Sequence, residues 1–169
     1  METEPGPTNV TAQIILIVIL TLINAFFASA EMAIVSINKN KVKHLAEEGN
    51  KKATILLKLM EEPTKFLSTI QVGITLAGFF SSASAATGLS GTFGELLKSI
   101  GIPYSNEIAL VVVTVILSYI TLVFGELFPK RIALQNAEAI AMFSVKPILF
   151  VSKVTLPFIK LLSLSTNLL

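Results

Sequence analysis

The chain alternates long apolar stretches with short polar segments. Three stretches reach the roughly 20 apolar residues that a helix needs to cross a bilayer. They run from Val10 to Ile37, from about Phe66 to Gly88, and from Ile108 to Phe128. The pattern predicts an all-α integral membrane protein in which a single transmembrane domain, residues 1–169, contains three transmembrane helices.

The polar segment between the first two spans predicts two short helices. Gly49 would end the first helix and Pro63 would mark the end of the second. We expect a helical hairpin against the cytoplasmic face, with its lysines toward solvent and phospholipid headgroups. The apolar residues of this segment recur at helical spacing, at Val42, Leu45, Ile55, Leu56 and Leu59.

The C-terminal segment, about 139–169, is apolar enough to suggest a fourth span. Pro147 and Pro157 would bend a helix here. Lysines on one helical face suit the headgroup region better than the bilayer centre. We expect a bent amphipathic juxtamembrane belt helix, with a fourth span as the alternative. The lysines recur every seven residues, at Lys146, Lys153 and Lys160.

Positive charge predicts the orientation. The connection 38–65 contains seven lysines, whereas the residues before the first span contain no lysine or arginine and the connection 89–107 contains only Lys98. Lys130 and Arg131 follow the third span directly. Because cytoplasmic loops are rich in lysine and arginine, we expect a multi-pass protein of the cell membrane with its N-terminus outside and its C-terminus in the cytoplasm. The acidic N-terminus is unlike a signal peptide, so the first span should be retained.

The composition agrees with a membrane protein and excludes several function classes. Charged residues make up 14% of the chain and the mean hydropathy is +0.76, whereas soluble domains carry about 25% charged residues. The chain has no cysteine, no aspartate and one histidine, which excludes disulfides, thiolate metal sites and a Ser-His-Asp triad. We therefore expect no enzyme and no catalytic residues. A net charge of +2 gives no sign of nucleic-acid binding.

Each predicted span carries its small and polar residues on one helical face. Such residues commonly pack helices against one another in membranes. For the stretch SSASAATG, residues 81–88, we expect a close helix contact or a dimer contact. The three series are Thr21, Asn24, Ala28 and Glu31; Ser68, Gln71, Thr75, Gly78 and Ser82; and Thr114, Ser118, Thr121 and Gly125.

Two carboxylates near the cytoplasmic ends of the spans, Glu31 and Glu126, need another explanation. An ionised side chain inside a bilayer costs about 3 kcal/mol or more unless it is paired or solvated. No lysine or arginine lies within the three predicted spans, so neither carboxylate has an evident partner there. Access to water, protonation and a bound cation all stay open.

The segment Gly-Glu-Leu-Phe-Pro-Lys, residues 125–130, favours a cation. Pro129 has no N–H and cannot donate to the carbonyl of Gly125. The sequence therefore predicts a carbonyl oxygen without its helical partner, beside the carboxylate of Glu126. Hard cations such as Mg²⁺ and Na⁺ prefer all-oxygen surroundings, and interrupted helices provide them in transporters.

Three stretches resemble the transmembrane domain of the cyclin M / CorC family: NAFFASAEMAIVSINKNKVKHLAEEGN, FLSTIQVGITLAGF and LVFGELFPKRIALQNAE. The resemblance implies a homodimer in the lipid bilayer with three transmembrane helices per subunit and a belt helix. It also implies Mg²⁺ export, for which Na⁺ coupling is proposed. Most members continue into a CBS-domain pair that binds nucleotide. We expect that module after Leu169, so nucleotide would bind only through domains absent from this chain.

The chain departs from the family pattern at possible ligands. Ile74 and Gly78 stand where Mg²⁺-transporting members have asparagines, and Ala28, Ser29 and Ala30 stand near the family's first-helix serines. Cation transport stays the expectation, whereas Mg²⁺ selectivity is open.

These observations predict cation transport, with Mg²⁺ efflux coupled to Na⁺ as its form, through a polar cavity open to the cytoplasm. The alternative is a non-transporting membrane scaffold or regulatory anchor, in which the polar series only pack helices. The predicted ligands are Glu126 as charged ligand or gate, Gly125 through its backbone oxygen, Ser29, Gln71 and Thr75 as neutral oxygen ligands, and Glu31 behind the ligands or at a coupling ion.

Overall fold

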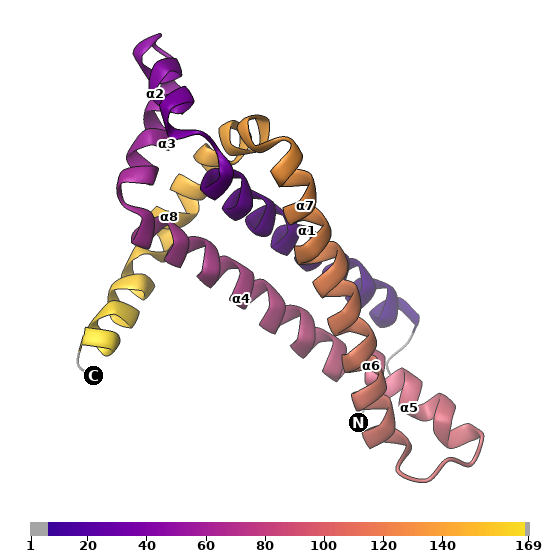
Figure 1. The fold of residues 1–169 in the computed structure, drawn as a ribbon. Helices are drawn as coiled ribbons and strands as arrows, with labels where there is room; N and C mark the ends of the chain where they lie inside the picture. The colour runs from indigo at the N-terminus through magenta and orange to yellow at the C-terminus, as the bar shows by residue number, and fades with distance from the viewer. Residues whose placement is uncertain (1–6, 168–169) are drawn as a thin grey trace. The chain divides into compact units, whose positions relative to one another are not determined.

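The structure is a computed structural model that describes residues 7–167. All regular structure within these residues is helical (Figure 1). The elements in chain order are α1 (Pro7–Ser36), α2 (Lys39–Glu47), α3 (Lys51–Glu61), α4 (Pro63–Thr87), α5 (Leu89–Ser99), α6 (Ser105–Leu122), the π-helical η1 (Val123–Leu127), α7 (Phe128–Gln135) and α8 (Ala137–Asn167).

The three predicted spans are confirmed as long apolar helices. They correspond to α1, to α4, and to the helical run formed by α6, η1 and α7. A fourth stretch, Ala137–Phe158 in α8, is also long and apolar enough to cross a membrane by length and composition.

Helix α8 has the length and composition of a fourth span as well as of a belt helix. This helix is continuous through Pro147 and Pro157. Lys146 and Lys153 are exposed, as the belt prediction requires. The side chain of Lys160 lies outside the described residues. The belt helix therefore stays a prediction.

The chain divides into two compact units. The first unit consists of Met1–Ala25 and Thr75–Leu127, and the second unit consists of Phe26–Ile74 and Phe128–Leu169. Helices α1 and α4 each have one part in the first unit and one part in the second. Each unit has its own packing.

In the first unit, α5 folds back along the start of α6 (Figure 1). Gly94 allows this approach, since a Cβ added to it would lie 2.4 Å from Oδ1 of Asn106. The apolar pattern predicted no helix in this connection. Much of the apolar surface of the unit is exposed, as expected for helices that face lipid, for example at Leu22, Phe79, Val111, Val115 and Tyr119.

The second unit contains the predicted helical hairpin, α2 and α3. Asn38 caps α2 by accepting from the backbone N–H of Asn40 at 2.9 Å, and Asn50 caps α3 by accepting from that of Lys52 at 3.0 Å. Gly49 adopts φ +88° between the two helices, a conformation that glycine adopts without strain. The prediction that Gly49 ends the first helix is confirmed. Its position on the cytoplasmic face stays a prediction.

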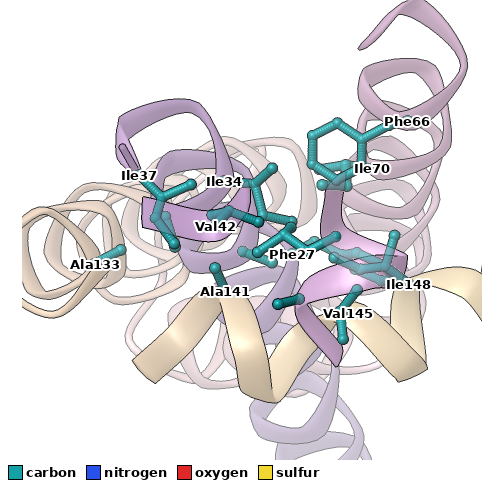
Figure 2. Packing of buried hydrophobic residues seen from close by; sticks show 14 residues of the cluster. Phe27, Ile34, Ile37, Val42, Phe66, Ile70, Ala133, Ala141, Val145 and Ile148 are labelled. Carbon is teal, nitrogen blue, oxygen red and sulfur yellow. The ribbon is translucent and has the colours of Figure 1, made fainter. Parts of the chain in front are cut away.

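An apolar core holds the hairpin to the other helices of the second unit (Figure 2). Its members come from α1, the hairpin, α4, α7 and α8, so distant segments share one core. Burial of these side chains is the main stabilising contribution in this unit. The largest of them are Phe27, Ile34, Ile37, Val42, Leu56, Phe66, Ile70, Val145 and Ile148.

Candidate cation site

The third span contains a π-helical turn at Val123–Leu127. Pro129, two residues after it, cannot donate a hydrogen bond to the carbonyl of Gly125, and its ring disfavours a regular α-helical turn there. A π turn accommodates the missing hydrogen bond and the proline ring, and the helix continues into α7. Such turns are frequent at functional sites. The sequence thus correctly predicted an irregular backbone at this segment.

The carbonyl of Gly125 finds its hydrogen bond on another helix. The side-chain Nδ2 of Asn24, 101 residues earlier on α1, donates to this oxygen at 3.2 Å. Asn24 is only 4% exposed. Asn24 belongs to the polar series of the first span but was not among the predicted ligands. The sequence could have indicated this residue, because Asn24 is a carboxamide in the middle of an apolar helix.

Gly125 allows α1 to approach η1 closely. A Cβ added at this position would lie 3.1 Å from Nδ2 of Asn24 and 3.4 Å from the methyl groups of both Thr21 and Thr121. A larger residue would therefore push the amide away from the carbonyl. Glycine at this point leaves room for the contact.

The other end of the Asn24 carboxamide is unsatisfied. Its Oδ1 is inaccessible to solvent and has no hydrogen-bond partner within the described residues. The amide cannot be reversed to avoid this, because its nitrogen has to donate to the Gly125 carbonyl. A buried acceptor without a partner costs about 1–3 kcal/mol. A cation beside this oxygen would remove the penalty.

The predicted ligands are divided between the two units. Gly125, Glu126 and Thr75 lie in the first unit. Gly125 contacts Asn24, Glu126 is half-buried, and Thr75 is on an exposed face of α4. A ligand role for Glu126 and Thr75 stays a prediction.

In the second unit, the predicted ligands Ser29, Gln71 and Glu31 have different surroundings. The Oγ of Ser29 donates to the carbonyl of Phe26 at 2.9 Å, a bond within its own helix. Gln71 is exposed and lines a cavity of about 380 Å³ together with Glu31 and Ser68. The structure therefore brings Gln71 and Glu31 to one cavity.

The expectation that Glu31 has no cationic partner is wrong. The Nζ of Lys130 lies 3.2 Å from Oε2 of Glu31, and the two side chains are 24% and 23% exposed. We expected the span to end at Phe128. The helix instead continues through Pro129 into α7, which carries Lys130 to the carboxylate. Glu31 thus has its charge compensated by the protein, and its role at a coupling ion stays a prediction.

Acidic ligands are sparse at this site. Over residues 7–167, as far as they are described, no group of three or more His, Cys, Asp or Glu side chains lies together. A cation would therefore be held mainly by amide, hydroxyl and carbonyl oxygens. Such neutral ligands bind hard cations weakly enough to release them.

Comparison with known proteins gives consistent matches. Residues 14–169 match the family model described as the cyclin M transmembrane N-terminal domain. A UPF0053 protein of Synechocystis is 36% identical over 162 residues, which cover 95% of this chain and 36% of that protein. The UPF0053 protein YugS of Bacillus subtilis is 33% identical over 159 residues, 93% of this chain and 37% of that protein.

The name of a third relative states its location. The UPF0053 inner membrane protein YfjD of Escherichia coli is 27% identical over 147 residues, which cover 87% of this chain and 32% of that protein. The chain thus spans about a third of the length of the curated relatives it matches.

Proposed function

This chain belongs to the cyclin M transmembrane domain family, and we propose that it is the membrane domain of a cation transporter that carries Mg²⁺ out of the cell in exchange for Na⁺. Its apolar helices and its likeness to an inner membrane protein support a multi-pass membrane protein. The substrate, the coupling ion and the direction of transport belong to the proposal.

The observation that carries the proposal is the unsatisfied carboxamide oxygen of Asn24. The carboxamide that carries this oxygen is on α1, a helix long enough to span the bilayer, and it bonds to the Gly125 carbonyl in a π-helical turn. Apolar surroundings make such an oxygen unfavourable without a partner. A cation that sheds part of its water would supply the missing partner, and the oxygen would replace part of the hydration shell.

Glu126 supplies negative charge next to these neutral oxygens in the proposed site. Mg²⁺ commonly retains several waters and uses only one or two carboxylates, so one carboxylate with a few neutral oxygens is a sufficient donor set. Ser29, Gln71 and Thr75 are proposed to bind the ion or its waters as it moves. Glu31, already paired with Lys130, is proposed to act at the Na⁺ site.

A scaffold without transport is the second candidate, and two contacts favour it. Asn24 bonds to the Gly125 carbonyl, and Lys130 pairs with Glu31. Both contacts are what helix packing alone would produce. The scaffold, however, gives no reason for the orphaned Oδ1 of Asn24.

Replacement of Asn24 with leucine in the full-length protein separates the two candidates. Leucine keeps a similar volume but removes both amide atoms. For a transporter, the Asn24→Leu protein should lose the stabilisation by Mg²⁺ or Na⁺ that the parent shows in thermal unfolding, together with flux in vesicles. The control Ser99→Leu alters an exposed polar residue in the same unit and should respond to ions like the parent. A parent protein that neither responds to cations nor transports them would favour the scaffold.

A further inference from the structure

A second buried carboxamide oxygen lies on the same helix as Asn24. Within the described part of the chain, the buried side-chain oxygens that lack a hydrogen-bond partner are Oδ1 of Asn24 and Oε1 of Gln13. Eleven residues separate them on α1. At 3.6 residues per turn this is close to three full turns, so both residues lie on one face of α1, about 16 Å apart along its axis.

Gly88 leaves the space that the Gln13 carboxamide occupies. A Cβ added to Gly88 would lie 1.7 Å from Oε1 and 2.1 Å from Nε2 of Gln13. The amide therefore occupies the space that a side chain at residue 88 would fill, at the junction of α4 and α5. At Gly88 the stretch 81–88 contacts a polar side chain of α1, and the close helix contact of the other residues in this stretch stays a prediction.

An apolar residue lies between the two carboxamides. Ile17 is only 6% exposed and is one turn from Gln13 and two turns from Asn24 on the same face of α1. The buried face of α1 in the first unit thus carries a polar group, an apolar group and a second polar group in succession. Hydrophobic constrictions flanked by polar contacts are typical of gated ion paths.

We propose that Gln13 is a second cation contact in the path that begins at Asn24, separated from it by an apolar constriction at Ile17. This inference rests on the proposed function and extends it toward the N-terminal end of α1, which the charge pattern predicts to be outside. The ligand is the transported hard cation after it passes Ile17. Oε1 of Gln13 replaces part of its hydration shell, and Gly88 leaves the space that this amide needs.

Packing alone accounts poorly for a carboxamide at residue 13. An aliphatic side chain would fill the space against Gly88 without burying an acceptor that has no partner. The orphaned oxygen is therefore the feature that an ion contact explains and helix packing does not.

The test compares three variants of the full-length protein in vesicles, with Mg²⁺ and Na⁺ flux measured separately. Gln13→Leu removes the oxygen. Gly88→Ala leaves Gln13 in the chain but displaces its amide, and the displaced atoms are the flexible end of a side chain, so the fold should tolerate the change. Gly91→Ala, on α5 three residues after Gly88, is the control, because no atom lies within 4 Å of the added Cβ.

We expect about tenfold slower flux for Gln13→Leu, the effect of losing one favourable contact at the barrier, and a smaller reduction for Gly88→Ala. Stabilisation by cations, which reports the Asn24 site, should persist in both variants, and Gly91→Ala should behave like the parent. The ion whose flux falls identifies which cation uses the contact. Gly88→Ala keeps the test decisive if Gln13→Leu does not fold.

Several results would overturn this inference. Unchanged flux of both ions in Gly88→Ala and in any folded Gln13→Leu protein, with flux in the parent, would remove Gln13 from the path and leave the proposed transport intact. Loss of cation-dependent stabilisation in Gln13→Leu would mean that residue 13 acts through the Asn24 site. Absence of flux in the parent would contradict both this inference and the proposed function.

Discussion

Two polar side chains on α1, seven residues apart, are satisfied in different ways. In the first unit, Asn24 donates to the Gly125 carbonyl and keeps an unsatisfied oxygen. In the second unit, the carboxylate of Glu31 pairs with Lys130 and also lines a cavity. The carboxylate of Glu31 thus has its partner within the protein, whereas the carboxamide oxygen of Asn24 lacks one.

This difference separates a structural contact from a candidate binding site. A half-buried ion pair compensates both of its charges and needs no ligand. A buried carboxamide with one satisfied end is held in place by its nitrogen while its oxygen stays available. The carboxylates attracted attention in the sequence because they carry charge. The contact geometry instead makes Asn24 the candidate ligand. Three substitutions test how the neighbouring charges and the backbone contribute to the site.

The largest effect is expected from Glu126→Gln in the full-length protein. If Glu126 supplies the negative charge beside the neutral oxygens, its loss should weaken cation-dependent stabilisation by about 100-fold in apparent affinity, since removing a charged contact costs about 2–3 kcal/mol. Thermal unfolding across Mg²⁺ and Na⁺ titrations measures this change. Glu107→Gln, which alters an exposed carboxylate in the first turn of α6, is the control. Identical titrations of the parent and the Glu126→Gln protein would remove Glu126 from the site.

A smaller effect is expected from Lys130→Met. This change leaves the half-buried Glu31 carboxylate without its cation and should lower the free energy of unfolding by about 1–2 kcal/mol, less than for a fully buried pair because water reaches both groups. Adding Glu31→Gln should recover most of the loss in a double-mutant cycle. Lys41 and Glu138, at 2.5 Å with side chains 60% and 42% exposed, provide a matched pair whose coupling should be close to zero. Equal coupling in the two cycles would show that the Glu31–Lys130 contact is no more than a surface pair.

The smallest effect is expected from Pro129→Ala. Alanine restores a backbone N–H that can compete with Asn24 for the Gly125 carbonyl. Cation-dependent stabilisation should weaken by only about threefold, since one hydrogen bond of about 1 kcal/mol is redistributed. Pro147→Ala removes an exposed proline inside α8 and should leave the titration unchanged. A stronger effect from Pro129→Ala than from Glu126→Gln would reverse the assigned importance of carbonyl and carboxylate.

Local features of the fold could be predicted because their causes are local. Apolar length defines α1, α4 and the third span, and the asparagine caps with Gly49 define the hairpin. Pro129 is sufficient to predict that the Gly125 carbonyl loses its helical partner. Each of these depends on residues within one or two helical turns.

The remaining features depend on contacts between distant segments. Asn24 and Gly125 are 101 residues apart, so no local pattern could pair them. The Glu31–Lys130 contact was missed because the third span was expected to end at Phe128, whereas a π turn lets the helix continue to Lys130. Helix α5 was missed because a short helix of 11 residues depends on packing against α6.

A structure of the full-length protein in a lipid bilayer with saturating Mg²⁺, and a second with Na⁺, tests the central claim most directly. The account predicts ion density beside Oδ1 of Asn24, with protein oxygens or ion-bound waters at about 2.0–2.4 Å from the ion. A protein donor on Oδ1 of Asn24 in both structures, with no ion density near the η1 segment, would contradict it.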